Sequence, residues 1–296
     1  MMLAPPGLSH RRVIIVGAGQ AGLAVAAALR AEGLEPQRDF IVIDGAPSLH
    51  LRSWRDRRAT LELLSDARHS AFPWRPLPGD QRRRIQADEM ADYLSAVEAA
   101  LGVETRWNVR ATSVEHSGSG TTLFLSTSAG IVQTRNVVCA TGATSRPASP
   151  SWASYLAVPG IVLHSHDYRS PDQIPRGDVL IVGGGDSALD WAIDLHEIAK
   201  VTLMHRRDEF RAAPGSVAKM KQLAAGGKLN LVYGQVMDLK GEGGQLSAAV
   251  VKTAEGATID HACDMMLPFF GLTMKLGPVA DFGLNLHENL IPVDTE

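Results

Sequence analysis

A cluster of basic side chains occupies one short stretch in the second half of the sequence. The cluster comprises His205, Arg206, Arg207 and Arg211. Guanidinium groups bind phosphate oxygens through charge-assisted and often bidentate hydrogen bonds. We interpret the cluster as a phosphate-binding group, and the alternative is an ordinary solvated turn that happens to carry several bases.

A strand, a glycine-rich turn and a helix precede this cluster. Residues 178–182 are mostly apolar, as in a buried parallel strand, and residues 189–198 favour a helix. The next strand pattern, residues 200–204, leads directly into His205. In a dinucleotide-binding unit an acid at this point favours a free ribose 2′-hydroxyl, whereas arginines favour a 2′-phosphate, so the unit is predicted to bind NADP(H). The expected cofactor contacts of its turn are Gly183, Gly185, Asp186, Ser187 and Ala188.

The same pattern occurs near the start of the chain. Residues 12–17 are predicted to form a buried parallel strand, because a short β-branched run without polar alternation fits a sheet that is covered on both faces. A helix is expected at residues 23–29, and a second strand at residues 40–44 ends in an acid, Asp44. The turn between the first strand and the helix has the spacing G-x-G-x-x-G and contributes Gly17, Gly19, Gln20, Ala21 and Gly22 as expected cofactor contacts.

Each part of the first turn has a physical task. Gly17 permits the tight turn, Gly19 lets backbone amides approach a pyrophosphate at the helix N-terminus, and Gly22 allows close packing of helix on strand. Asp44 can accept hydrogen bonds from ribose hydroxyls. These features predict a dinucleotide site, and an incidental glycine turn is the alternative.

The residues between the two turns predict how the chain is organised. Residues 87–101 place apolar side chains on one helical face, and three short strands are expected at residues 109–114, 121–126 and 131–138. Prolines at positions 147, 150 and 159 mark a crossover to a second domain, and residues 264–271 mark a return. We therefore expect an α/β fold of two Rossmann-like domains, the second inserted in the first. The expected boundaries are 1–145 for the first domain, 146–271 for the second and 272–296 for a partial return to the first.

Composition excludes several other classes of protein. A net charge of -3 gives no general reason to bind nucleic acid or an anionic membrane. The two cysteines, Cys139 and Cys263, form no CxxC pair and no metal-ligand spacing, so we expect buried thiols, no metal site and a reducing, cytoplasmic setting. The uncharged run at residues 13–29 imitates a membrane span or a secretory signal, but its glycines and the strand that follows favour a folded, soluble unit.

Four segments of the second half carry a resemblance to a known family. They are GDVLIVGGGDSALDWA, HRRDEFRAAPGSVAKMKQL, LPFFGLTMKLGPVADFGL and NLIPVDT. The second half resembles the thioredoxin-reductase-like ferredoxin/flavodoxin-NADP(+) reductases, which are flavoproteins with two dinucleotide-binding domains. The resemblance implies FAD in the first domain, NADPH in the second with Arg211 and the preceding HRR around its 2′-phosphate, and ferredoxin or flavodoxin as acceptor. A homodimer is also expected.

The first half resembles flavin-dependent monooxygenases and CzcO-like flavoproteins. The carriers are LRSWR at residues 51–55 and QADEMADYL at residues 86–94. Gly160, His164 and Tyr168 also fit the monooxygenase pattern F-x-G-x-x-x-H-x-x-x-Y, with Val158 at its first position. The resemblance places Trp54 near the flavin, and Val109, Thr141 and Gly142 complete the expected cofactor contacts.

Three functions stay open on the sequence. The leading one is an NADPH-dependent FAD oxidoreductase, for which no catalytic side chain is named because hydride transfer needs no acid, base or nucleophile from the protein. The others are a flavin monooxygenase and a non-catalytic NADP(H)-binding or redox-sensing protein. The resembled reductases continue beyond the IPVDT segment with a helix that closes over the flavin, so the flavin segment is expected to be incomplete at Glu296.

Overall fold

The chain divides into two compact units, which are described separately below. The first unit comprises Met1–Pro147 and Met274–Glu296, and the second comprises Ala148–Thr273. The computed structural model describes residues 11–55, 57, 61–118, 120–142, 177–243, 245–271, 276, 279–280, 284–288 and 290–294. The expected boundary residues 145, 146 and 272 and the prolines at 147, 150 and 159 lie outside the described residues.

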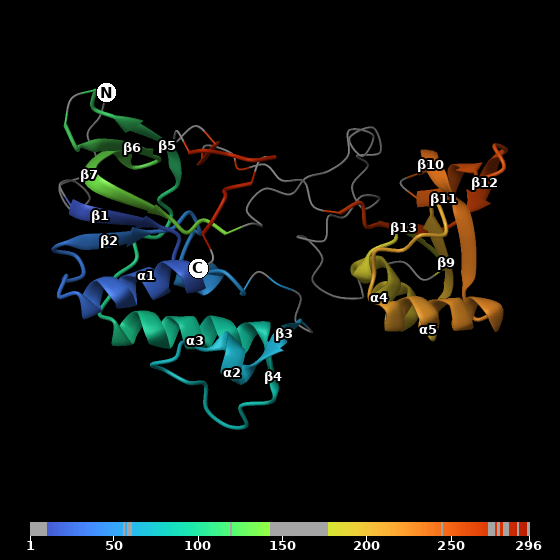
Figure 1. Cartoon of the computed structure of the whole chain (residues 1–296), viewed down its shortest axis with the longest axis horizontal. Helices are drawn as coiled ribbons and strands as arrows, with labels where there is room; N and C mark the ends of the chain where they lie inside the picture. Colours follow the sequence, from blue (N-terminus) through green and yellow to red (C-terminus); the bar gives the residue numbers. More distant parts are fainter. Residues whose placement is uncertain are drawn as a thin grey trace. The chain divides into compact units, whose positions relative to one another are not determined.

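The first unit is built on a five-stranded mixed sheet (Figure 1). Its strands, in the order β2-β1-β7-β6-β5, are Phe40–Ile43, Arg11–Val16, Gly130–Cys139, Leu123–Thr127 and Ala111–His116. Strand β1 pairs in parallel with β2 and β7, whereas β5, β6 and β7 form an antiparallel ribbon. The carboxyl ends of β1, β2 and β7 therefore meet at one edge of the sheet.

Two helices pack on one face of this sheet. Helices α1 (Gln20–Ala31) and α3 (Ala87–Ala100) lie side by side and share a core with alternate residues of β1 and β2. The other face of the same strands packs with side chains of the antiparallel ribbon. Because both faces are covered there, residues 13–16 of β1 and all of β2 are apolar. The smaller elements are η1 (Leu49–Leu51), β3 (Glu62–Asp66), α2 (Ala67–Ser70) and β4 (Arg84–Gln86).

The second unit has a six-stranded sheet in the order β12-β11-β10-β9-β8-β13. These strands are Thr258–Ala262, Gln245–Thr253, Asn230–Glu242, Lys200–His205, Asp178–Val182 and Met265–Pro268. Strands β13, β8, β9 and β10 are parallel to one another, and β11 and β12 extend the sheet in antiparallel fashion. Helices α4 (Asp186–Leu195) and α5 (Pro214–Ala225) pack together against one face.

The elements predicted around both glycine turns are confirmed. The expected helix at 87–101 is α3, and its apolar residues Met90, Leu94, Val97 and Leu101 are buried. The three strands expected after it are β5, β6 and β7, although β7 is longer than expected because it pairs with both β6 and β1. Helix α5 and the antiparallel ribbon β10–β12 were not anticipated.

The prediction of two buried thiols is half wrong. Cys263 is buried, and burial raises its thiol pKa to about 11, but Cys139 is exposed at the end of β7. The apolar run at 13–29 folds as β1 and α1. Among the described residues, no helix has both the length and the apolar character needed to cross a membrane.

Candidate dinucleotide-binding turns

Two glycines of the first turn stand where no side chain fits. Gly17 has a φ of 114°, and a Cβ there would lie 2.2 Å from the Ala140 carbonyl oxygen. A Cβ on Gly22 would lie 1.8 Å from the Gly17 oxygen. Both neighbours are backbone atoms, so a side chain at either position requires the turn itself to move. The turn is thus packed against the end of β7 on one side and against α1 on the other.

Gly19 differs, because the space beside it is open. A Cβ at Gly19 would meet only the Ser53 hydroxyl, at 3.4 Å. Gly19 precedes α1, which begins without a side-chain cap and without an acidic residue in its first turn. An uncapped helix N-terminus presents backbone N–H groups and a partial positive charge. The residues present therefore fit a pyrophosphate group at this turn.

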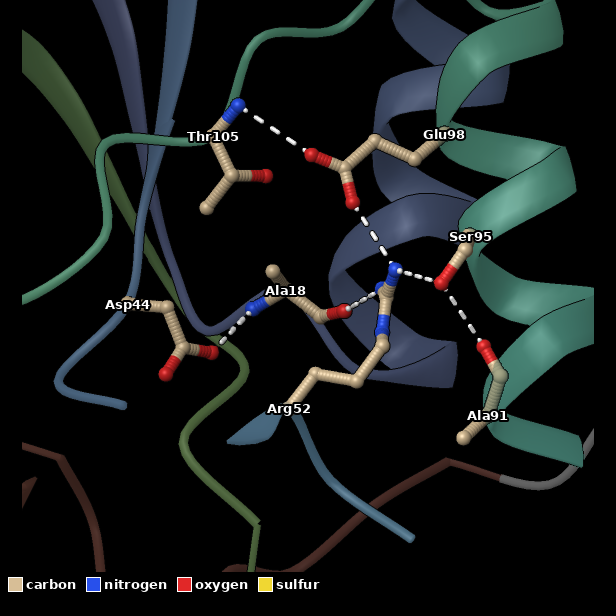
Figure 2. Close-up of polar contacts among 7 residues, drawn as sticks. All are labelled: Ala18, Asp44, Arg52, Ala91, Ser95, Glu98 and Thr105. Atoms are coloured by element: carbon tan, nitrogen blue, oxygen red, sulfur yellow. Dashed lines mark hydrogen bonds and ion pairs between the residues drawn. The ribbon is translucent and has the colours of Figure 1, made fainter. Parts of the chain in front are cut away.

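The peptide groups of Ala18 are held at both ends by side chains (Figure 2). The Ala18 N–H donates to Asp44 Oδ2 at 2.8 Å, and the Ala18 carbonyl accepts from Arg52 Nη2 at 2.7 Å. The other oxygen of Asp44 accepts from the Ala46 N–H at 2.8 Å. A carboxylate has about four acceptor positions, so these two bonds leave Asp44 able to accept from ribose hydroxyls. That role stays a prediction.

A buried ion pair lies directly beneath the turn. The side chains of Arg52 and Glu98 are 1% and 8% exposed, and Arg52 Nη1 lies 2.9 Å from Glu98 Oε2. Burial lowers the pKa of Arg52, and the charges of Glu98 and Asp44 oppose that shift. Sequence reasoning missed this pair. The available signal was Glu98 itself, an acid placed four residues after buried Leu94 on the inward face of α3.

The remaining expected contacts of the first unit differ in how they are placed. Gln20 donates from its side chain to the Ser70 carbonyl at 3.1 Å, which ties the start of α1 to α2. Val109 has a buried side chain and donates its N–H to the Asp44 carbonyl at 2.9 Å. Thr141 and Gly142 follow β7 and are exposed, so they lie at the same sheet edge as the turn and Asp44. Ala21 is also exposed, in the first turn of α1.

Trp54 has an unusual backbone conformation. Its φ is 80°, in the left-handed region that a bulky residue rarely adopts, and its side chain packs partly buried against the core of the first unit. Such strain persists only where the surrounding structure imposes it, often near a functional site. The expected position of Trp54 near a flavin stays a prediction. Gly160, His164 and Tyr168 lie outside the described residues, as does Val158.

The second turn is held mainly by packing and backbone contacts, and Asp186 supplies one charged contact. A Cβ on Gly184, a residue not among the expected contacts, would lie 2.4 Å from Cε1 of His205. The His205 ring also packs on Phe210, with ring centroids 5.2 Å apart, and its Nε2 lies 3.0 Å from the Glu209 carbonyl oxygen. His205 therefore holds the loop after β9 against the turn. A role for His205 at a phosphate is not tested by these contacts.

Backbone contacts complete the second turn. Gly183 has a φ of 157°, and a Cβ there would lie 2.9 Å from the Ala188 Cβ. The Arg211 N–H donates to the Gly184 carbonyl at 2.7 Å. Asp186 accepts from the Ala213 N–H at 2.7 Å, and Ser187 beside it is exposed. Gly185 precedes α4, which begins without a side-chain cap, and a Cβ at Gly185 would meet nothing within 4 Å.

The three arginines of the basic cluster extend into solvent at this turn. Arg206, Arg207 and Arg211 are all exposed. Arg207 Nε lies 3.0 Å from Glu209 Oε2, an ion pair between side chains that are 51% and 72% exposed. An ion pair this exposed contributes little free energy. A phosphate could therefore displace Glu209 at small cost.

Asp208, the other acid of the segment, is ionised and paired with neighbouring side chains. Lys221 Nζ lies 2.8 Å from Asp208 Oδ1, and the Tyr233 hydroxyl is hydrogen-bonded to the same carboxylate. These contacts lower the pKa of Asp208, while burial and Asp208 raise the pKa of Tyr233 to about 12. The negative charge of Asp208 is thus balanced, and the neighbouring arginines remain available for an anion.

Comparison with known proteins decides the family. The family model described as pyridine nucleotide-disulphide oxidoreductase matches residues 14–296. The chain belongs to this family. The resemblance to flavoproteins with two dinucleotide-binding domains, which the two glycine turns indicated, is thereby confirmed.

Individual relatives agree with this assignment. The chain is 53% identical over 160 residues to a ferredoxin–NADP reductase of Rhodopseudomonas palustris (strain BisB18), a match that covers 54% of this chain and 46% of that protein. The chain thus spans less than half the length of this curated relative.

Solved structures support the fold. The bacillithiol disulfide reductase Bdr from Bacillus cereus superposes with a TM-score of 0.75 at 18% identity, covering 94% of this chain and 83% of that one. The flavin-containing monooxygenase from Stenotrophomonas maltophilia gives a TM-score of 0.68 at 21% identity, with coverages of 97% and 86%. These likenesses confirm the expected α/β fold of two Rossmann-like domains.

Proposed function

We propose that the chain is an FAD-dependent NADPH oxidoreductase, which passes a hydride from NADPH to the flavin and electrons onward to an acceptor such as ferredoxin or flavodoxin. The observation that carries the proposal is the contrast between the two turns. The first is followed by an acid, Asp44, and the second by three exposed arginines. The name of the Rhodopseudomonas relative supports the same activity.

The first turn suits the adenine dinucleotide half of FAD. Gly19 leaves room for a pyrophosphate at the uncapped start of α1, and Asp44 retains acceptor capacity for ribose. When bound, FAD supplies a ring that accepts a hydride and releases electrons singly or in pairs. The protein's own task in this reaction is to bind, orient and shield the reacting groups.

The second turn suits NADP(H) rather than NAD(H). Gly185 and the start of α4 also provide an open, uncapped helix N-terminus, although Asp186 lies in its first turn. Arg206, Arg207 and Arg211 carry the positive charge that a 2′-phosphate requires. Asp208 forms an ion pair with Lys221 and a hydrogen bond with the Tyr233 hydroxyl. These contacts limit the repulsion between Asp208 and that phosphate.

The proposal extends to the setting of the protein. An acceptor protein of the ferredoxin or flavodoxin class, a cytoplasmic location and a homodimer all follow from the resembled reductases. Analytical ultracentrifugation of the purified chain tests the dimer. A titration with reduced and oxidised ferredoxin tests the acceptor.

The direct test is anaerobic mixing of the FAD-loaded chain with NADPH, followed by visible absorption. The proposal predicts loss of the flavin band near about 450 nm and its return when oxidised ferredoxin or flavodoxin is added. A chain that binds FAD stoichiometrically but keeps the band after NADPH addition contradicts it. NADPH binding with no FAD binding after reconstitution favours the non-catalytic alternative.

A flavin monooxygenase is the second candidate. The LRSWR segment, which resembles flavin-dependent monooxygenases, favours it, and the strained backbone of Trp54 in that segment is typical of a functional site. Oxygen uptake coupled one-to-one to the oxygenation of an added small nucleophile would support this candidate. Oxygen uptake that yields only hydrogen peroxide would count against it.

A further inference from the structure

We propose that Arg52, held in place by Glu98, is a positioning residue that presents the Gly19 N–H of the first turn to the pyrophosphate of a bound dinucleotide. The inference rests on the proposed FAD site of the first unit. It assigns a role to a buried cation that neither the glycine pattern nor hydride transfer requires.

The geometry of the Ala18–Gly19 peptide carries the inference. Arg52 Nη2 donates to the Ala18 carbonyl at 2.7 Å, so this oxygen points into the protein interior (Figure 2). In a trans peptide the carbonyl of one residue and the N–H of the next point in opposite directions. Fixing the Ala18 oxygen inward therefore fixes the Gly19 N–H outward. The open space beside Gly19 is where an approaching phosphate group would find this N–H.

Asp44 secures the other side of the same residue. Its Oδ2 accepts from the Ala18 N–H at 2.8 Å. Ala18 is consequently held between an acid that follows β2 and a guanidinium that follows η1. With both polar groups of Ala18 engaged, the next peptide cannot flip without breaking a charge-assisted hydrogen bond.

Helix α3 holds Arg52 in this orientation. Nη1 donates to Glu98 Oε2 at 2.9 Å and to Ser95 Oγ at 3.1 Å, and the guanidinium lies 5.6 Å from the ring centroid of Trp107. Glu98 is itself fixed, because its Oε1 accepts from the Thr105 N–H at 3.2 Å. The guanidinium is thus held by α3 and Trp107 in addition to its hydrogen bond to the Ala18 carbonyl.

Stability alone does not account for this pair. Replacing a buried ion pair by apolar side chains of similar volume is often neutral or stabilising, since desolvation offsets the Coulomb attraction. Arg52 Nε is buried and has no hydrogen-bond partner among the described residues, which adds to that cost. Burial also lowers the pKa of Arg52. Burying Arg52 costs free energy. Its role in orienting the binding turn explains why it is nevertheless present.

The double variant Arg52→Met/Glu98→Met tests the inference in the full chain. It removes both charges together and so leaves neither one buried alone. Because the Ala18 carbonyl and the Thr105 N–H each lose a partner, we expect an unfolding midpoint moderately below that of the wild type and FAD affinity weaker by about 10- to 100-fold, the scale set by one hydrogen bond to a charged group. Hydrogen exchange of the ligand-free variant should also be faster at the Ala18 amide, whose hydrogen bond to Asp44 depends on the fixed turn, a readout that does not depend on turnover.

The matched control is Arg83→Met/Glu89→Met. Arg83 and Glu89 form an ion pair at the start of the same helix α3 with side chains that are 32% and 34% exposed. This variant should bind FAD as the wild type does. If Arg52→Met/Glu98→Met does not fold, Arg52→Met/Glu98→Gln serves instead. Glutamine keeps an acceptor for the Thr105 N–H, whereas the Ala18 carbonyl still loses its donor, so the same loss of FAD affinity is expected.

The outcomes separate the inference from the proposed function. A folded Arg52→Met/Glu98→Met chain, or a folded Arg52→Met/Glu98→Gln chain, that binds FAD within about twofold of the wild type overturns the role of Arg52 and leaves the FAD site intact. A wild-type chain that binds no FAD overturns the proposed function, and the inference with it. Equal losses in the double variant and in the Arg83→Met/Glu89→Met control show a general effect of charge and also overturn the inference.

Discussion

The two glycine turns share a backbone pattern but are held by different forces. In the first unit, charged side chains point inward, and Asp44 and Arg52 form hydrogen bonds with the N–H and the carbonyl of Ala18. In the second unit the turn is held mainly by the His205 ring and by backbone bonds, with one bond from the Ala213 N–H to the Asp186 carboxylate, and the arginines extend into solvent. Similar glycine-rich turns therefore do not imply identical chemistry. The residues after the second strand of each unit set the charge that a ligand meets.

The largest effect that tests this comparison is expected at Gly22. A Cβ there would lie 1.8 Å from the Gly17 oxygen, so Gly22→Ala should destabilise the first unit by about 3 kcal/mol. Urea unfolding followed by circular dichroism measures this change. Gly19→Ala is the control, since its Cβ would meet only Ser53 at 3.4 Å. It should keep the stability and lose FAD affinity, and equal destabilisation by both changes would contradict the account of the turn.

The next effect concerns coenzyme choice. Arg206→Ala/Arg207→Ala should weaken NADPH binding by about 100-fold, because two charge-assisted bonds to the 2′-phosphate are lost. NADH lacks that phosphate, so its affinity should change little. Titrations with each nucleotide give the two constants, with Lys228→Ala, an exposed lysine elsewhere in the second unit, as control. A parallel loss for NADPH and NADH would show that the arginines act through general charge.

A smaller effect distinguishes packing from charge at the second turn. The Cβ of Gly184→Ala would lie 2.4 Å from the His205 ring, whereas a Cβ at Gly185 would meet nothing within 4 Å. We expect Gly184→Ala and His205→Ala to be coupled by about 1 kcal/mol in a double-mutant cycle of unfolding free energies. Gly185→Ala and His205→Ala should be additive. If the unfolding free energies of Gly184→Ala and His205→Ala are additive, the His205 ring does not hold the turn.

The smallest effect is a dependence on pH. The pKa of Tyr233 is raised from about 10 to about 12, chiefly by burial and then by Asp208. The folded protein thus holds this proton more tightly than the unfolded chain, and its contribution to stability falls as pH rises from about 10 through about 12. The urea midpoint should drop less over this range in Tyr233→Phe than in the wild type. An identical drop in both proteins would show that ionisation of Tyr233 does not contribute to the loss of stability.

The sequence predicts the parts of this molecule that local patterns encode. Apolar runs and glycine turns located β1, α1, β8 and α4, and helical periodicity located α3 with Met90 and Leu94 inward. The contacts that hold the turns were not predictable in this way. Arg52 and Glu98 are 46 residues apart, and their pairing depends on how α3 packs beside α1. Likewise, no local rule places the His205 ring on Gly184.

The backbone contacts of Asp44 and the exposure of Cys139 could not be predicted from local sequence patterns. Asp44 was expected to face a ribose, yet its two oxygens also bind the backbone of Ala18 and Ala46. Cys139 was expected to be buried like Cys263, but it ends β7 at the edge where the strand leaves the sheet. Both outcomes follow from tertiary position, which periodicity does not report.

The assignment of one nucleotide to each turn is tested most directly by hydrogen–deuterium exchange of the full chain with each ligand in turn. The account predicts that FAD protects the amides of residues 17–22 and that NADP(+) protects those of residues 183–188 and 205–211. Protection of the same turn by both nucleotides, or of residues 17–22 by NADP(+) and of residues 183–188 by FAD, would contradict it.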